Sequence, residues 1–332
     1  MYLDYKTNDE KGQEVLRDYR LVNGEKKKVN WSEHKSCTED LSKAYERLKN
    51  KAKAFRIADC GTVLDFKIEG DIKRLYHANF CKIRLCPMCA WRRSLKIFAQ
   101  VSKIMTVYEM DKPRSAFLFL TLTCRNVTGE NLSRQIDVLA AAFSRLQKHK
   151  RFGKSVQAWF RCLEVTHNLQ TDTYHPHYHV ILAVDENYFG SGYYISQKEW
   201  TDIWQNCLKV DYMPIVDIRR FKASKAGEGK EIAEVAKYAA KVTDYVIRDD
   251  TGSIDEKRTD RAVAILDSAL ANRRLIAFGG HFRRLHKLLN LDDTEDGDLV
   301  YVSPEDLRED ISQMIVRYRW HIGYKNYILD KN

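Results

Sequence analysis

Three histidines occupy alternate positions in the segment His175-Pro-His177-Tyr-His179, and the apolar run Val-Ile-Leu follows them. This run predicts a buried strand over Tyr178–Val184. Side chains two residues apart on a strand point to the same face of the sheet. We therefore expect His177 and His179 to project together, with His175 beside them if the strand begins early. Two neutral imidazoles placed in this way are suitable ligands for a divalent cation.

A divalent cation needs a further ligand, and the sequence offers two candidates upstream. Glu164 lies thirteen residues before His177, in the segment Val156–Val165, which predicts a neighbouring strand. A carboxylate with two imidazoles suits Mn²⁺ or Mg²⁺ and would also suit Zn²⁺. His167 is the competing third ligand. The simplest alternative leaves Glu164 as an ordinary exposed strand residue.

A second group of reactive side chains lies in the segment 231–247, which predicts a helix. Glu234, Tyr238 and Lys241 are spaced so that they share one helical face, and Tyr245 extends that face as a structural residue. The opposite, packing face consists of Ile232, Val235, Ala236, Ala239 and Val242. A tyrosine hydroxyl is a weak nucleophile, and a neighbouring cation activates it by lowering its pKa. The alternative is a solvated helix with a Glu–Lys pair.

The cysteines indicate a second metal site. The chain has eight cysteines, and Cys86-Pro-Met-Cys89 has the spacing of a structural zinc half-site. We expect Cys60 and Cys81 to complete a four-cysteine zinc site, with His77 as the alternative to Cys60. A redox-active pair would also have this spacing, and so would reduced cysteines that bind no metal. The cysteines that we expect to be unligated are Cys37, Cys124, Cys162 and Cys207.

Basic residues surround this cysteine segment. The expected DNA contacts are Arg84, Arg92, Arg93 and Lys96, with Trp91 among them. Cations with an interleaved aromatic side chain suit phosphate contact and base stacking. A second basic group lies between residues 273 and 287. It either contacts DNA or forms the solvent-exposed face of a helix. Its members are Arg273, Arg274, Arg283, Arg284 and Lys287.

These side chains require an α+β framework to position them. The segments predicted as strands are 116–124, 156–165, 178–184 and 212–221. Helices are predicted for 90–108, for 129–149 and for a segment that Ser196 caps and that ends at Leu208. Ser42–Phe55 predicts a short basic helix. The order of strands and helices indicates a mixed or antiparallel sheet flanked by helices.

Composition narrows the class of protein. The chain has 332 residues, 56 Lys and Arg against 46 Asp and Glu, and a net charge of +10. The length suggests roughly two domains. No apolar run approaches the ~20 residues of a membrane span, and the charged N-terminal residues lack the apolar stretch of a secretory signal. We therefore expect a cytoplasmic protein that is not bound to a membrane, with a charge that permits a polyanionic partner.

Taken together, the motifs resemble a known family. A buried strand that ends in Thr-Leu-Thr, the His-Pro-His-Tyr-His segment and a later Glu-x-x-x-Tyr-x-x-Lys resemble the HUH endonucleases. Within that group they resemble the Rep_1-type replication initiators of rolling-circle plasmids, as does the run Cys-x₄-Cys-Pro-x-Cys with its arginines. The resemblance covers residues 57–250.

This resemblance implies a fold, a reaction and partners. The fold is an HUH-type antiparallel sheet in which His177 and His179 bind the catalytic cation. Tyr238 attacks a phosphodiester of single-stranded or hairpin origin DNA and forms a 5′-phosphotyrosyl link. Glu234 activates the water that ends the round, and Lys241 orients the phosphate or stabilises the phenolate. A host helicase and a host polymerase are the implied protein partners.

The expected organisation has four parts. Residues 1–56 form a basic polar region, 57–110 a Cys-rich zinc segment, 111–250 the HUH endonuclease domain and 251–332 a helical C-terminal region of open role. Two other functions remain open from the residues alone. One is a non-enzymatic zinc-containing DNA-binding protein, and the other is a metal-dependent nuclease that uses water only. The oligomeric state is also open, with a homodimer as one form.

Overall fold

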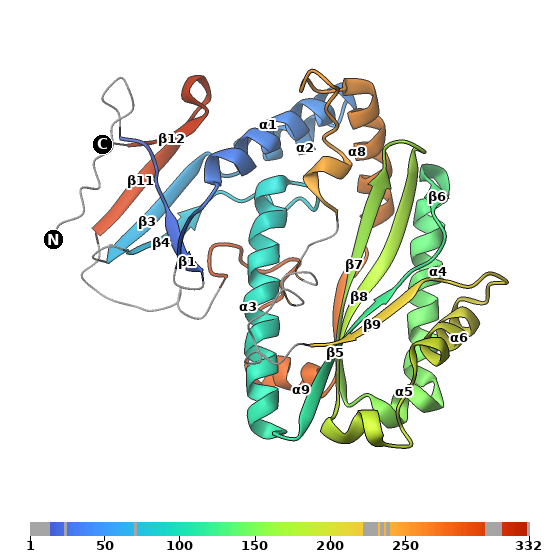
Figure 1. Cartoon of the computed structure of the whole chain (residues 1–332). Helices are drawn as coiled ribbons and strands as arrows, with labels where there is room; N and C mark the ends of the chain where they lie inside the picture. The colour runs from blue at the N-terminus through green and yellow to red at the C-terminus, as the bar shows by residue number, and fades with distance from the viewer. Residues whose placement is uncertain are drawn as a thin grey trace.

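The computed structural model describes residues 14–22, 25–69, 72–221, 232, 236, 240–302 and 314–330. Within these residues, α-helices surround antiparallel β-sheets (Figure 1). The α+β class predicted from the sequence is therefore confirmed. No helix in the described part of the chain is both long and apolar enough to cross a membrane.

The larger sheet has the order β10-β7-β8-β5-β9, and β6 pairs with β8. Its strands are β5 (Ser115–Leu122), β6 (Val127–Thr128), β7 (Ala158–Asn168), β8 (Thr173–Asp185), β9 (Val216–Arg220) and β10 (Ile276–Gly280). Every pairing is antiparallel. The long hairpin of β7 and β8 lies at the centre, which gives its side chains neighbours on both sides.

Helices cover both faces of this sheet (Figure 1). Their bounds are α3 (Pro87–Asp111), α4 (Gly129–Lys148), α5 (Lys150–Ser155), α6 (Gln197–Leu208), α8 (Glu256–Leu270) and α9 (His281–Leu288). The helices α4, α5 and α6 lie on one face, and α3 and α9 lie on the other. The helix α6 begins as predicted, because the Ser196 side chain and Glu199 form a reciprocal capping box.

A smaller sheet stands apart from the large one, at the N-terminal end of α3 (Figure 1). Its strands are β3 (Val63–Glu69), β4 (Ile72–Ala78), β11 (Met314–His321) and β12 (Asn326–Leu329), in the antiparallel order β12-β11-β3-β4. The N-terminal elements are β1 (Tyr19–Val22), β2 (Glu25–Lys28), α1 (Trp31–Arg47) and α2 (Lys51–Asp59). The helix α1 contacts α2, α3 and α8, so it joins the N-terminal part of the chain to α3 and to the later helix α8.

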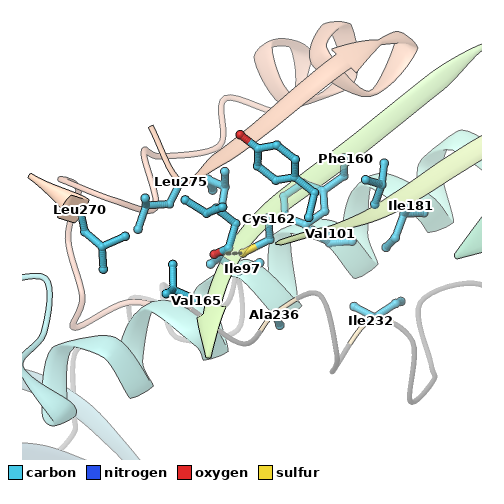
Figure 2. Close-up of a cluster of buried hydrophobic side chains, with 14 of the residues drawn as sticks. Ile97, Val101, Phe160, Cys162, Val165, Ile181, Ile232, Ala236, Leu270 and Leu275 are labelled. Atoms are coloured by element: carbon cyan, nitrogen blue, oxygen red, sulfur yellow. Dashed lines mark hydrogen bonds between the residues drawn. The ribbon is translucent and has the colours of Figure 1, made fainter. Parts of the chain in front are cut away.

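The long helix α3 builds the core on one face of the large sheet. Figure 2 shows Ile97 and Val101 of α3 beside Phe160 and Cys162 of β7, and all four are buried. Alternation along β7 therefore turns residues 160, 162 and 164 towards α3. This face carries the candidate site, so α3 both fills the core and covers the site.

Two described residues of the segment 231–247 are buried in the same core. Ile232 and Ala236 are 1% and 4% exposed, and both are labelled in Figure 2. The amide of Ala236 donates a hydrogen bond of 2.9 Å to the carbonyl of Ile232, which is one helical turn. Both residues belong to the packing face expected for this helix. Residues 233–235 and 237–239 lie outside the described residues.

The prediction of a helical C-terminal region is wrong in part. The helices α8 and α9 are present, but β10 adds an edge strand to the large sheet, and β11 and β12 belong to the small sheet. The strand β11 alternates between exposed and less exposed residues from Ile315 to Trp320, as one half-buried strand does. The single helix predicted over Ser42–Phe55 is also wrong, because α1 ends at Arg47 and Asn50 caps α2.

Candidate functional site

The pairing of β7 with β8 gathers three side chains on the face that α3 covers. Glu164 lies directly opposite His177, and Cys162 lies directly opposite His179. Because the two histidines are two residues apart, they share the face of Glu164. Glu164, His177 and His179 are buried, with 3%, 8% and 8% of their surfaces exposed.

The nitrogen and oxygen atoms of this trio converge. The Glu164 Oε2 atom lies 3.0 Å from Nε2 of His179 and 3.5 Å from Nε2 of His177. The two Nε2 atoms are 3.2 Å apart. Two unprotonated imidazole nitrogens present only lone pairs to each other, whereas a cation between them satisfies both. The trio therefore fits a divalent cation, and we refer to it as the Glu-His-His site.

His167 and His175, the other histidines near this position in the sequence, are not part of the group. His167 stacks on Tyr174 with ring centroids 4.3 Å apart, and its Nε2 atom lies 2.9 Å from Asp172 Oδ1. The ring centroid of His175 lies 5.1 Å from that of His177. Among the described residues, the group close enough to share one cation here is Glu164, His177 and His179. The structure thus brings Glu164, and not His167, to the histidine pair.

Outer contacts orient the ligands. Nδ1 of His177 donates to the carbonyl of His175 at 3.1 Å, and Nδ1 of His179 pairs with Thr121 Oγ1 at 3.3 Å. Such contacts leave Nε2 of each ring for the site. Burial favours a higher pKa for Glu164, but the two adjacent histidines outweigh it and hold that pKa well below its ordinary value. The carboxylate is therefore ionised at neutral pH.

Lys241, from the segment predicted as the catalytic helix, reaches this site. Its Nζ atom lies 3.7 Å from Oε1 of Glu164, and its side chain is 52% exposed. Asp244 holds the segment in place, because its Oδ2 accepts from the Lys241 amide at 3.0 Å and its carbonyl pairs with Nδ1 of His167 at 3.0 Å. The predicted nucleophile Tyr238 and the predicted base Glu234 lie outside the described residues.

Tyr245 has a structural position, as expected. Its hydroxyl donates to the carbonyl of Leu85 at 2.6 Å, and 1% of its surface is exposed. Burial raises the pKa of this phenol well above its ordinary value. A buried phenol that keeps its proton and already donates a hydrogen bond is a poor nucleophile.

The second cluster of metal-ligand residues is the predicted set of four cysteines. The set is Cys60, Cys81, Cys86 and Cys89, and all four are buried. Cys60 follows α2, Cys81 follows β4, and Cys86 is the N-cap of α3 with Pro87 next to it. The alternative ligand His77 is 59% exposed and lies 3.4 Å from Asp65. The structure therefore brings Cys60, and not His77, to the cluster.

The spacing of the sulfur atoms fits a tetrahedral ion. Cys60 Sγ lies 3.5 Å from Cys89 Sγ and 3.6 Å from Cys86 Sγ, and Cys81 Sγ lies 3.7 Å from Cys89 Sγ. A tetrahedral zinc with metal–sulfur bonds of about 2.3 Å separates its sulfur atoms by about 3.8 Å. Backbone amides of residues 81, 82 and 83 also donate to these sulfur atoms. We refer to this set as the four-cysteine site.

A buried cation accompanies the four-cysteine site. Lys35 of α1 has no exposed surface, and its Nζ donates to the carbonyls of Ala58 at 2.6 Å and Cys60 at 2.9 Å. Burial favours a higher pKa for Cys86, but hydrogen bonds from the other three sulfur atoms hold it well below its ordinary value. Burial lowers the pKa of Lys35, and the neighbouring Cys60 and Cys86 oppose that effect by favouring its charged form.

The basic residues expected to contact DNA have internal partners. Arg92, Arg93 and Lys96 are 0%, 2% and 3% exposed. Arg92 donates to the carbonyls of Leu299 and Val300, and Lys96 to Asp292 and the carbonyl of Asp298.

Arg84 and Arg93 also bind backbone carbonyls. Arg84 donates to those of Leu270 and Arg273, and Arg93 to those of Lys82, Ile83 and Glu295. These contacts join α3 and the cysteine segment to residues 270–300. This placement does not support the expectation of phosphate contacts, because Arg92, Arg93 and Lys96 are buried, Arg84 is partly buried, and all four already donate to internal acceptors.

A pocket of about 270 Å³ opens beside Glu164. Its walls come from α1, the first turns of α3, Glu164 and the segment 240–242. His34 and Trp91 lie face to face in its lining, with ring centroids 4.5 Å apart and an interplanar angle of 14°. Burial lowers the pKa of His34 to about 4, so this imidazole is neutral at neutral pH.

Sequence reasoning missed His34, Thr121 and Asp244. A signal existed for Thr121, because it is a polar residue between the buried Leu120 and Leu122 at the end of an otherwise apolar strand. No pattern marked His34 or Asp244, since their roles depend on contacts with α3 and β7 that lie far along the chain.

Comparisons with known proteins show the family to which the chain belongs. The sequence profile of Rep_1, described as a replication protein, matches residues 72–328. A "Protein rep" of Bacillus amyloliquefaciens is 42% identical over 326 residues, which cover 91% of this chain and 94% of the relative. A "Protein rep" of Streptococcus pneumoniae serotype 2 is 38% identical, and the alignment covers 90% of this chain and 92% of the relative. No solved structure matches the chain. The chain belongs to the Rep_1 family of replication proteins.

Proposed function

We propose that this protein initiates rolling-circle replication of a plasmid by nicking one strand of its origin DNA. The observation that carries the proposal is the convergence of Glu164, His177 and His179, with Lys241 beside them. Membership of the Rep_1 family supports the replication role. The antiparallel sheet that presents both histidines supports an HUH-type catalytic domain.

The Glu-His-His site would hold Mn²⁺ or Mg²⁺, and that cation supplies Lewis-acid polarisation of the scissile phosphate. The residues of the chain provide the geometry. The β7–β8 register fixes Glu164 opposite His177, and the contacts at Nδ1 fix both rings. Lys241 places a half-exposed cation beside the carboxylate, where it orients a phosphate oxygen or stabilises a phenolate.

Tyr238 is the nucleophile in this proposal. It lies three positions before Lys241 in the sequence, and Lys241 reaches the Glu-His-His site. Its phenolate oxygen forms a bond to phosphorus, and the bond from phosphorus to the 3′ oxygen breaks. The 3′ oxygen takes up a proton and leaves as a 3′-hydroxyl, while the 5′ phosphate stays on tyrosine.

Glu234 ends the cycle in this proposal by taking a proton from water, which then displaces tyrosine from phosphorus. The released 3′-hydroxyl is the primer for a host polymerase, and a host helicase separates the strands. The four-cysteine site would hold a structural zinc that fixes α3 over the Glu-His-His site. DNA contact through Arg84, Arg92, Arg93 and Lys96 is not part of the proposal, since each has internal partners.

The test is to incubate the protein and Mn²⁺ with overlapping single-stranded oligonucleotides from the origin region of its plasmid. We expect a covalent adduct on a denaturing gel, which peptide mass spectrometry maps to Tyr238. The Tyr238→Phe variant should form no adduct and should keep DNA binding. The matched control is Tyr193→Phe, which removes an exposed hydroxyl and should form the adduct normally.

Each other result selects a different function. Cleavage without an adduct indicates a metal-dependent nuclease that uses water. Binding without cleavage, across several metals and all oligonucleotides, indicates a zinc-containing DNA-binding protein. An adduct that survives Tyr238→Phe excludes Tyr238 as the nucleophile.

A further inference from the structure

The pocket beside Glu164 shares a wall with the Glu-His-His site. Oε2 of Glu164 faces the two histidines, and its Oε1 lies 3.7 Å from Lys241 Nζ. Glu164 and Lys241 also line the pocket. A ligand in the pocket therefore lies next to any phosphate that the metal site and Lys241 hold.

The rest of the lining is mainly apolar and aromatic. Pro87, Ala90 and Val242 supply aliphatic surface, and His34 and Trp91 supply a stacked pair of rings. Trp31 packs edge-on against Trp91, with ring centroids 4.7 Å apart, and this contact fixes the orientation of the pair. A volume of about 270 Å³ lies just below the ~300–1,000 Å³ of sites for drug-sized ligands, so it favours one planar group.

We propose that this pocket binds one nucleobase of the DNA strand, next to the phosphodiester that is cut. The inference rests on the proposed nicking function and adds a binding site to it. A nucleotide joins an anionic phosphate to a planar aromatic base, and the site offers a cationic position beside an aromatic pocket. Aromatic side chains bind the bases of single strands by stacking, which every base permits.

The base also has a positional role. A base held by His34 and Trp91 anchors its nucleotide, so that the neighbouring phosphate cannot slide along the Glu-His-His site. The four-cysteine site and Pro87 begin α3 at this point, and α3 carries Ala90 and Trp91. The pocket thus depends on the four-cysteine site for its shape and on Glu164 for its proximity to the reaction.

Two variants test the pocket in opposite ways. Trp91→Ala removes one ring of the pair, and Ala90→Leu fills the pocket while it leaves the rings and the helix in place. The matched control is Ala99→Leu, the same change on the same helix at a position that does not line the pocket. Mn²⁺ binding, measured by electron paramagnetic resonance, shows that each variant is folded at the metal site.

The first arm uses an oligonucleotide that the protein nicks, with a single abasic residue at successive positions around the cut. We expect one position at which the missing base weakens binding to the wild type and to Ala99→Leu by about 5- to 150-fold. The same abasic residue should cost little in Trp91→Ala and Ala90→Leu. A flat scan in the wild type, or a loss that persists in both pocket variants, overturns the inference.

The second arm separates this inference from the nicking function. Overlapping origin oligonucleotides that carry 2-aminopurine are titrated with protein, because stacking on an aromatic ring quenches the fluorescence of this base. We expect quenching at one position in the wild type and in Ala99→Leu, and its loss in both pocket variants. If no oligonucleotide is cut but this pattern holds, the nicking proposal fails and the base pocket stands. If cutting occurs and no position is quenched, the base pocket is excluded.

Discussion

Arg93 provides a quantitative test of whether the basic residues of α3 support the fold or contact DNA. Its guanidinium donates to the carbonyls of Glu295 at 3.0 Å, Ile83 at 3.3 Å and Lys82 at 2.5 Å, and 2% of the residue is exposed. The substitution Arg93→Met keeps an apolar stem of similar length. It removes all three donors and leaves three carbonyls without this partner.

The expected cost follows from these contacts. Hydrogen bonds that involve a charged group contribute about 1.5–3 kcal/mol each, so three give a gross value of about 4–9 kcal/mol. Water entry and local relaxation recover part of that, and we expect a loss of about 3–5 kcal/mol in the free energy of unfolding. At about 2–4 °C per kcal/mol, the melting temperature falls by roughly 6–20 °C.

The assay combines thermal unfolding with the salt dependence of single-stranded DNA binding. The control is Arg283→Met on the exposed side of α9, where the same loss of charge should change stability by about 0.5 kcal/mol or less. A phosphate contact would lower the slope of log K against log salt by about 0.7 when it is removed. An unchanged melting temperature together with that smaller slope would refute the structural role of Arg93.

Three further outcomes are expected. The substitution Cys81→Ser should lower bound zinc from about one ion per chain, measured by inductively coupled plasma mass spectrometry, and bound zinc that stays at one would exclude Cys81 as a ligand. His179→Ala should weaken Mn²⁺ binding by about 100-fold or more while the exposed His321→Ala does not, and equal affinities measured by electron paramagnetic resonance would contradict the site. Burial lowers the pKa of His34 to about 4, so the unfolded chain takes up this proton first and stability falls as the pH drops from about 6.5 to 4. Over that pH range, the free energy of unfolding of His34→Phe, measured in urea, should fall by about 3 kcal/mol less than that of the wild type. Identical decreases in the two proteins would show that His34 does not titrate in this way.

The sequence predicted the metal-ligand residues better than their surroundings. Alternation along one strand was enough to place His177 and His179 together, and residue type and spacing indicated the four cysteines. The sequence could not decide whether Glu164 or His167 is the third metal ligand. These two residues are three apart on β7 and face opposite sides, and only the register with β8 shows which side carries the histidines.

Two features were beyond the sequence for the same reason, which is that the partner lies far along the chain. The internal partners of Arg92 and Arg93 are backbone carbonyls near residues 295–300, which no side-chain pattern reveals. The strand β11 was missed although Val316, Tyr318 and Trp320 alternate with exposed residues. It pairs with β3, and Tyr318 lies opposite Leu64.

This pairing of β11 with β3 bears on how the protein is made. The chain that ends in β3 leaves the ribosome about 250 residues before its sheet neighbour does, and β7 likewise waits for β10. Contacts between such distant segments form slowly, because a long loop must close first. A nascent or truncated chain therefore has β3 without β11, and α3 without the 292–300 segment that binds its arginines. Biosynthesis thus delays completion of the large sheet until β10, which ends at Gly280, has been translated, and completion of the small sheet until β12, which ends at Leu329.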